Sequence, residues 1–245
     1  MPYRRLPNTD HGRIKALELA VEKNGYREDG KLVLPYKLVN DASAFLDKFK
    51  QVHQLYQQSF DIQVKANKKY QKQVKTVRLY ISHFIQVLNM SIIRNEIKRE
   101  RKKLYGLESY GNQVPDLTTE ASLLKWGDAV IRGESERVVQ GGVPIYNPTI
   151  AKVKVQFSIF SDGYYNQKNL QNNTLQYQEK IALMRDCADE LILQIWNHVE
   201  EIYAELPLSA KLNRCREFGV VYYYRPKEKQ AIMSEKLQKK LDFND

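Results

Sequence analysis

The sequence predicts an all-α protein in which one long helical unit is duplicated to form an antiparallel helical bundle. Glycine and proline, which interrupt helices, are absent between Tyr36 and Tyr105, and only Gly163 lies between Thr149 and Leu206. Apolar residues recur in both blocks at steps of three and four, and stretches of one block match stretches of the other. Short extra helices and a candidate small β-hairpin complete the predicted fold.

Residues 1–36 are predicted to form a helix and an extended arm. Asn8 or Thr9 offers a side-chain oxygen to the first free N–H groups of a helix that runs to about Asn24 and stops at Gly25. The β-like run Lys31–Pro35 follows, and a second such run, Gly219–Tyr224, is its candidate partner in a small sheet.

Residues 37–110 and 149–226 are predicted to be the first helical unit and its duplicate. Each carries an apolar stripe at helical spacing, which buries one face of a helix against its neighbours. The stripes consist of Phe45, Phe49, Val52, Tyr56, Phe60, Tyr70, Val74, Val77, Ile81, Phe84, Leu88 and Ile92 in the first unit, and of Val153, Phe157, Phe160, Tyr164, Ile181, Ala188, Ile192, Ile195, Val199, Ile202 and Leu206 in the second.

Both stripes become polar halfway along, and two structures account for this. Each unit is either a hairpin, turning near Asn67–Lys68 or Asn172–Asn173, or one helix of roughly fifty residues with a polar layer at its middle. The unbroken phase of the stripes favours the single helix, whereas the polar composition favours the turn. Of the two, we expect the hairpins. The polar positions are Gln63, Asn67, Gln167, Gln171 and Thr174.

Two pairs of matching stretches indicate the duplication. They occur in the same order in both blocks and suggest a pseudo-two-fold arrangement, with a short insertion around Pro207. Both blocks end in a basic turn followed by glycine, a common way to stop a helix. The matches are Tyr70–Val74 with Tyr177–Ile181, Arg78 with Arg185, Arg101–Leu107 with Arg214–Val220, and Tyr110 with Tyr223.

The linker, residues 111–148, is predicted to contain a short helix. It begins at Thr118–Thr119, is interrupted at Gly133 and ends at Gly141–Gly142. The following run to Pro148 is the nearest approach to a ligand loop, but it lacks the phosphate-cradling pattern of glycines and lysine, so we interpret it as a helix stop and a turn. Residues 227–245 are a charged tail, and all five parts are expected to form one compact domain.

Bulk composition limits the classes of function. Apolar residues make up 42% of the 245 residues, too many for a disordered chain, and no apolar run is long enough for a membrane span. Two cysteines, Cys187 and Cys215, and the lack of a secretory leader predict a cytoplasmic location. The net charge of +10 favours acidic partners.

No catalytic, cofactor-binding or metal-binding residue is predicted. His198 and Glu201 share a helix face, but the position that corresponds to His198 in the first unit is Ser91, so a paired metal site is missing a ligand. Cys187 lies beside the apolar stripe and is interpreted as a packing residue.

The basic surface is the strongest candidate for binding an anionic partner, but lysine-rich helical faces are usually just solvated, and a solvated face is the preferred interpretation. One ridge recurs at helical spacing, a second cluster ends the first unit, and a third follows the tyrosine run. The candidate residues are Lys65, Lys68, Lys72, Lys75, Arg94, Lys98, Arg99, Arg101, Lys102, Lys103, Arg225 and Lys227.

Three runs, Tyr80–Asn89, Gly141–Pro148 and Gly219–Tyr222, resemble a family of uncharacterised helical proteins from Bacteroidota. The resemblance extends over most of the chain. It implies a single shared architecture and brings no catalytic residue, cofactor or partner with it.

We therefore expect a non-enzymatic interaction or structural protein that docks a macromolecular partner, and we expect this partner to be another protein. One alternative is a nucleic-acid-associated basic helical protein. Another is an enzyme or ligand-binding protein with a site between the two halves. A homodimer formed through an exposed aromatic stripe also stays open.

Overall fold

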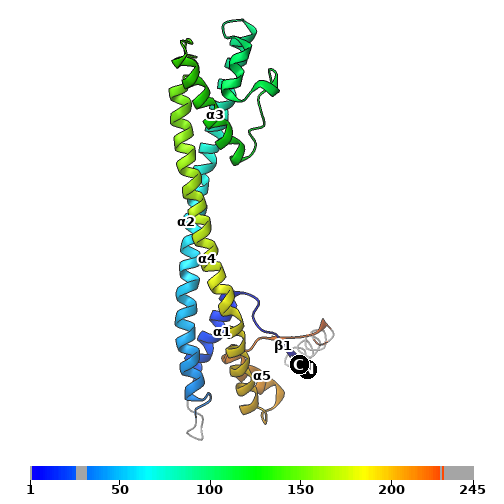
Figure 1. Cartoon of the computed structure of the whole chain (residues 1–245). Coiled ribbons are helices and arrows are strands. Elements are labelled where there is room, and N and C mark those ends of the chain that lie inside the picture. The colour runs from blue at the N-terminus through cyan, green and yellow to red at the C-terminus, as the bar shows by residue number, and fades with distance from the viewer. Residues whose placement is uncertain (1, 26–31, 227, 229–245) are drawn as a thin grey trace, which may run out of the picture. The chain divides into compact units, whose positions relative to one another are not determined.

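The computed structural model describes residues 2–25, 32–226 and 228, and the predicted all-α fold is confirmed (Figure 1). Two long helices dominate the chain, and the predicted tail 227–245 lies outside the described residues except for Glu228. No described helix has the length and apolarity to cross a membrane. The elements are β1 (Tyr3–Arg4), α1 (Asp10–Lys23), α2 (Tyr36–Ile93), the 3-10 helices η1 (Arg99–Tyr105) and η2 (Glu108–Tyr110), α3 (Glu120–Val139), α4 (Ile150–Ile202), α5 (Leu208–Glu217) and β2 (Tyr222–Tyr223).

The expected hairpins are wrong, because both blocks form single helices. The 58 residues of α2 continue through Asn67–Lys68, and the 53 residues of α4 continue through Asn172–Asn173. No glycine or proline interrupts the backbone hydrogen bonds at these points. Polar side chains are accommodated on the buried stripe, where the Thr174 hydroxyl donates to the carbonyl of Leu170 at 3.0 Å.

The chain folds into two compact units. Their boundaries differ from those of the two predicted helical units, residues 37–110 and 149–226. Unit 1 contains residues 1–57 and 176–245, and unit 2 contains residues 58–175. Each unit therefore takes one part of α2 and one part of α4. Within a unit, the beginning of one long helix lies with the end of the other, so the two helices are antiparallel.

Unit 1 buries α1 against α2 and α4, with Phe49, Ile192 and Trp196 in its core. The Thr9 side chain accepts from the N–H of Gly12, so the predicted cap and start of this helix are confirmed. The small sheet pairs Tyr222–Tyr223 with Tyr3–Arg4 instead of with the run at Lys31–Pro35. The N-terminal segment takes this place because its backbone continues the ladder, with the N–H of Arg5 donating to the carbonyl of Val221.

Unit 2 buries α3 against the end of α2 and the start of α4. Thr119 caps α3 as predicted, but Gly133 does not interrupt it. A Cβ atom at this position would lie 2.6 Å from the Tyr105 ring and 2.7 Å from the carbonyl oxygen of Leu104. Glycine is therefore required because η1 packs directly on the backbone of α3.

The same turn geometry ends η1 and α5. The two turns lie at positions that match when the two halves of the sequence are aligned with each other. Gly106 and Gly219 adopt left-handed φ values of 67° and 82°. The N–H of Leu107 donates to the carbonyl of Lys102 at 3.2 Å, and the N–H of Val220 donates to the carbonyl of Cys215 at 3.2 Å. This pattern satisfies the last carbonyls of a helix before the chain turns away.

Candidate anion-binding cleft

The first wall of the cleft is the segment that leaves α2. Asn95 has a left-handed φ of 60°, and the N–H of Glu96 donates back to the carbonyl of Ser91 at 2.9 Å, so the chain reverses sharply. Ile97 is buried by this turn, while Arg94, Glu96 and Lys98 stay exposed. The burial of one apolar residue thus fixes charged side chains on both sides of it.

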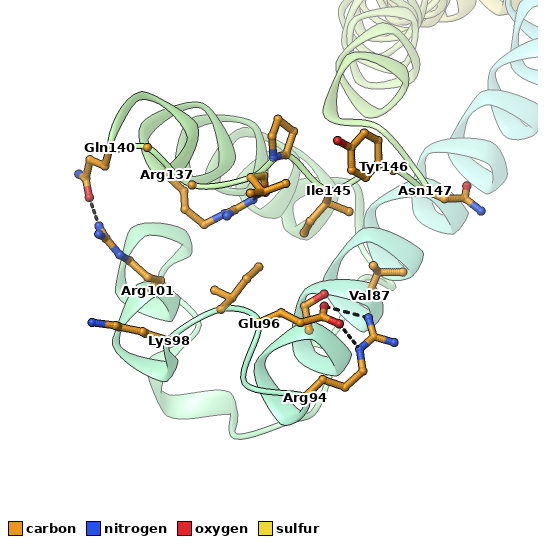
Figure 2. A pocket seen from close by; sticks show the side chains of 16 residues that line it. Val87, Arg94, Glu96, Lys98, Arg101, Arg137, Gln140, Ile145, Tyr146 and Asn147 are labelled. Atoms are coloured by element: carbon orange, nitrogen blue, oxygen red, sulfur yellow. Dashed lines mark hydrogen bonds and ion pairs between the residues drawn. The ribbon is translucent and has the colours of Figure 1, made fainter.

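The second wall is the end of α3 and the loop that follows. Gly141 adopts a φ of 84°, and the N–H of Gly142 donates to the carbonyl of Arg137 at 3.0 Å, which turns the chain back over the helix end. Ile145 is buried, and the peptide bond between Asn147 and Pro148 is cis. The loop thus lies across the cleft from the first wall (Figure 2).

A buried network supports the second wall. Glu134, which is 0% exposed, accepts from Arg137 Nε at 2.9 Å and Nη2 at 2.8 Å, from the Tyr105 hydroxyl at 2.5 Å and from the N–H of Ile145 at 3.0 Å. Arg137 Nη2 also donates to the carbonyl of Val143 at 2.7 Å. One carboxylate therefore joins η1, α3 and the loop into a single rigid support.

The same network fixes the charge of Arg137. Burial opposes its charged form, but the hydrogen bonds that it donates to Glu134 and Tyr105 outweigh burial and raise the pKa of the guanidinium. Burial, together with the hydrogen bond to Glu134, raises the pKa of Tyr105, so its hydroxyl keeps its proton. Arg137 is only 4% exposed, and its Nη1 makes no hydrogen bond within the described part of the chain.

The cleft between the walls has a volume of about 720 Å³, and four cationic side chains line it: Arg94, Lys98, Arg101 and Arg137. Arg94 is already paired with Glu96 at 2.8 Å, and Arg101 donates to the uncharged Gln140 (Figure 2). Lys98 and Arg101 make no ion pair within the described residues. The cleft thus keeps a net positive charge after its internal pairs are counted, which favours an anion.

The rim of the cleft is apolar. Tyr146 is 78% exposed and Val143 is 70% exposed, and both line the cleft from the loop. Side chains of this size at such exposure form a patch that water solvates poorly. A ligand here meets cations inside the cleft and apolar surface at its edge.

The structure brings together only some of the basic residues that the sequence suggested. Arg94, Lys98 and Arg101 line the cleft, whereas Arg99 and Lys103 are exposed outside it. Lys102 is a correction, because it is buried and donates to the Gly111 carbonyl and to Asn112 Oδ1. Burial, with the nearby charge of Arg99, lowers the pKa of Lys102.

The remaining candidates lie away from this site. Lys65, Lys68, Lys72 and Lys75 are exposed along α2 in unit 2 and make no ion pair among the described residues. Arg225 belongs to unit 1. Lys227 lies outside the described residues.

Arg137 was missed by sequence reasoning, although a signal for it existed. Glu134 and Arg137 are three residues apart on a predicted helix, in phase with Leu123, Trp126 and Val130 on its buried stripe. An opposite-charge pair on a buried stripe indicates an internal ion pair instead of a solvated face.

No group of three or more metal-ligating side chains occurs within residues 2–25, 32–226 and 228. Comparison with known protein families, curated proteins and solved structures gives no match to this chain. The arrangement of the cleft therefore has to indicate function by its own chemistry.

Proposed function

We propose that this chain is a non-enzymatic docking protein whose cleft in unit 2 binds an acidic segment of another protein. The observation that carries the proposal is the convergence of four cations from the α2 exit, η1 and α3 on one cleft. Arg137 is held by Glu134 and Tyr105, so it meets an incoming carboxylate without losing side-chain freedom. Lys98 and Arg101 supply the charge that Glu134 and Glu96 do not cancel.

The apolar rim supports a protein partner. Tyr146 and Val143 are exposed and line the cleft beside the cations. Tyrosine and arginine, which both line this cleft, are enriched in protein interfaces relative to the rest of a protein surface. The exposed face of α2 between Lys75 and Arg94 also carries apolar groups, including Leu79 and Met90, so the two basic clusters do not form a continuous phosphate track.

A nucleic-acid partner is the second candidate, and the ridge of Lys65, Lys68, Lys72 and Lys75 favours it. These side chains are exposed on one unit together with the cleft, and no carboxylate of the described residues pairs with them. Binding through them releases counterions and weakens steeply with salt.

Duplication of an ancestral helical unit is part of the proposal. Supporting it, Arg78 donates to the carbonyls of Leu117 and Thr118 just before α3, and Arg185 donates to Asp10 at the start of α1. The two arginines occupy matching positions when the two halves of the sequence are aligned with each other. Each therefore anchors the N-terminal end of the short helix in its own unit.

A charge-reversal experiment tests the cleft. The Lys98→Glu/Arg101→Glu double variant is titrated by fluorescence anisotropy with two labelled probes of equal charge, a glutamate-rich peptide containing leucine and an oligodeoxythymidine. Peptide binding should weaken by at least tenfold, because a hydrogen bond to a charged group contributes about 1.5–3 kcal/mol. Lys154→Glu, at an exposed α4 position outside the cleft, is the matched control.

The two candidates separate by the variant that affects each probe. Tighter binding of the oligonucleotide, lost in Lys68→Glu/Lys72→Glu and not in Lys98→Glu/Arg101→Glu, would replace the protein partner with nucleic acid. Equal peptide binding by the cleft variant and the Lys154→Glu control would refute the cleft as the docking site.

A further inference from the structure

Unit 1 contains a second hollow, a groove of about 600 Å³ between one face of α1 and the segment that follows α5. Ala16 and Leu19 of α1 line it, and Tyr223 contributes an aromatic side chain whose ring stacks on Tyr3 with centroids 6.1 Å apart. Lys15 and Arg216 supply positive charge. The groove therefore combines apolar surface, an aromatic wall and two cations.

The same construction recurs in unit 2, where a hollow of about 470 Å³ lies between α3 and η1–η2. Thr9 and Thr119, which cap α1 and α3, define matching positions on these helices. Gly106 and Gly219 do so for the two closing turns. By this correspondence Lys15 matches Lys125, Arg216 matches Lys103 and Tyr223 matches Tyr110, and all six residues line the two hollows.

The buried faces of the two short helices obey the same correspondence. Four buried positions of α1 fall on four buried positions of α3, so both helices present the same face to their units. The pairs are Arg13 with Leu123, Ala16 with Trp126, Leu17 with Gly127, and Ala20 with Val130.

One of these pairs distinguishes the two hollows. In unit 2, the indole of Trp126 is only 5% exposed and meets the Tyr110 ring edge-on, with centroids 5.2 Å apart. Lys125 Nζ lies 4.9 Å from the centre of the same indole. In unit 1 the matching residue is Ala16, so the tyrosine and the lysine are present while the indole between them is missing.

The charges of the unit 1 groove are also uncompensated. Among the described residues, Lys15 forms no ion pair, and Arg216 donates only to uncharged oxygens, Asn213 Oδ1 at 3.1 Å and the Tyr224 hydroxyl at 2.9 Å. A carboxylate beside an incoming ring would complement both cations.

We propose that the unit 1 groove binds an aromatic side chain, flanked by carboxylates, from a partner protein. The ring takes the place that Trp126 holds in unit 2, between a tyrosine and a lysine, where aromatic and cation–π contacts stabilise it. The carboxylates pair with Lys15 and Arg216. This site is separate from the cleft of unit 2, and the chain then engages its partner at two places.

The test uses the full-length ¹⁵N-labelled chain and a synthetic peptide, acetyl-Gly-Asp-Trp-Glu-Gly-amide, in an NMR titration. The expected result is saturable shifts of the backbone amides of Lys15, Leu19, Gly219 and Val221. A peptide with alanine in place of tryptophan should cause no saturable shift at the same amides. Because neither Lys98 nor Arg101 lines this groove, the Lys98→Glu/Arg101→Glu variant should bind the tryptophan peptide like the native chain.

The correspondence between units provides the matched control. Lys15→Glu should weaken the peptide by about tenfold, the loss expected for one charge-assisted hydrogen bond. Lys125→Glu reverses the matching charge where Trp126 already fills the site, so it should leave the affinity unchanged. Trp126→Ala should open a second site, with new shifts at Lys125 and Tyr110. If that variant unfolds, the comparison of Lys15→Glu with Lys125→Glu still shows whether the peptide binds in the unit 1 groove.

Four results would overturn the proposal. Equal losses in Lys15→Glu and Lys125→Glu would show general charge attraction. Equal binding of the alanine peptide would show that the ring is irrelevant. Stronger peptide binding after removal of Asp242–Asp245, or self-association abolished by Lys15→Glu, would make the occupant the chain itself.

Discussion

The carboxylate of Glu134 and the guanidinium of Arg137 form a two-point ion pair, at 2.9 and 2.8 Å, in the interior of unit 2. The pair is local in sequence, yet its remaining hydrogen bonds reach Tyr105 of η1 and Ile145 of the loop. The pair thus connects Arg137, which lines the cleft, to the buried network around Glu134 that supports the wall of the cleft.

Replacing Glu134 with glutamine should destabilise unit 2 by about 3–5 kcal/mol, because a buried guanidinium then lacks its countercharge. Urea unfolding followed by circular dichroism measures the change. Glu136→Gln, two residues further on and on the exposed side of α3, is the control and should change stability by less than about 0.5 kcal/mol. A similar small effect of both substitutions would show that the pair is not needed for folding.

The pair between Asp10 and Arg185 predicts a pH dependence for unit 1. The hydrogen bond from Arg185 lowers the pKa of Asp10 below its ordinary value of 3.8, against the opposing effect of burial. A lowered pKa in the folded state stabilises the fold above pH 3.8, and this contribution is lost as the pH falls through the folded value.

Asp10→Asn should therefore lower the melting temperature at pH 7, and the difference from the native chain should vanish at the most acidic pH. Thermal unfolding between about pH 7 and pH 2 measures this convergence. Asp61→Asn, at an exposed position of α2, is the control. A difference between Asp10→Asn and the native chain that stays constant with pH would contradict the role of this carboxylate.

Gly133→Ala tests the close packing of η1 on α3. Alanine is the better helix former by about 1 kcal/mol, yet its Cβ would overlap the backbone carbonyl of Leu104, which cannot move aside as a flexible side chain can. We expect a net loss of about 1–3 kcal/mol in the free energy of unfolding. Ser135→Ala, on the exposed face of α3, is the control without a close contact to η1, and it removes only a local hydrogen bond to the carbonyl of Ile131. A stabilised Gly133→Ala chain would mean that η1 moves to accommodate the added Cβ atom.

Asn172→Pro distinguishes a continuous α4 from a hairpin. Within a helix, proline removes a hydrogen bond and clashes with the preceding turn, at a cost of about 3 kcal/mol, whereas a turn accepts it. We expect lower helicity and a lower melting temperature by circular dichroism. Asn172→Ala should be neutral or slightly stabilising. If the chain tolerates proline at this position, α4 turns there and the hairpin prediction is correct.

Sequence reasoning succeeded where the signal is local. The Thr9 and Thr119 caps and the stops at Gly106 and Gly219 depend on a few neighbouring residues, and the structure contains all of them. The prediction of hairpins is wrong because polar side chains on the stripe do not by themselves end a helix. Without glycine or proline, the backbone hydrogen bonds continue through these positions. Gln167 is buried on the seam of α4, which shows that a long amide can lie on a packed face without turning the chain.

Lys102 shows why the candidate site was only partly predictable. A run of cations was interpreted as a solvated surface, but η1 is a 3-10 helix with three residues per turn. Lys102 and Tyr105 therefore share one face, and both are buried. The cleft itself depends on α3 and the loop meeting the exit of α2, a tertiary contact that the spacing of charges does not encode.

The division into units has a consequence for biosynthesis. Residues 58–175 are continuous, so unit 2 is complete once its last residue has left the ribosome. Residues 1–57 emerge earlier but have to wait for residue 176 and those after it, because their core partners Ile192 and Trp196 are translated after unit 2 is complete. Nascent unit 1 therefore exposes part of its apolar core until those residues emerge, and such transiently exposed surface is prone to aggregate.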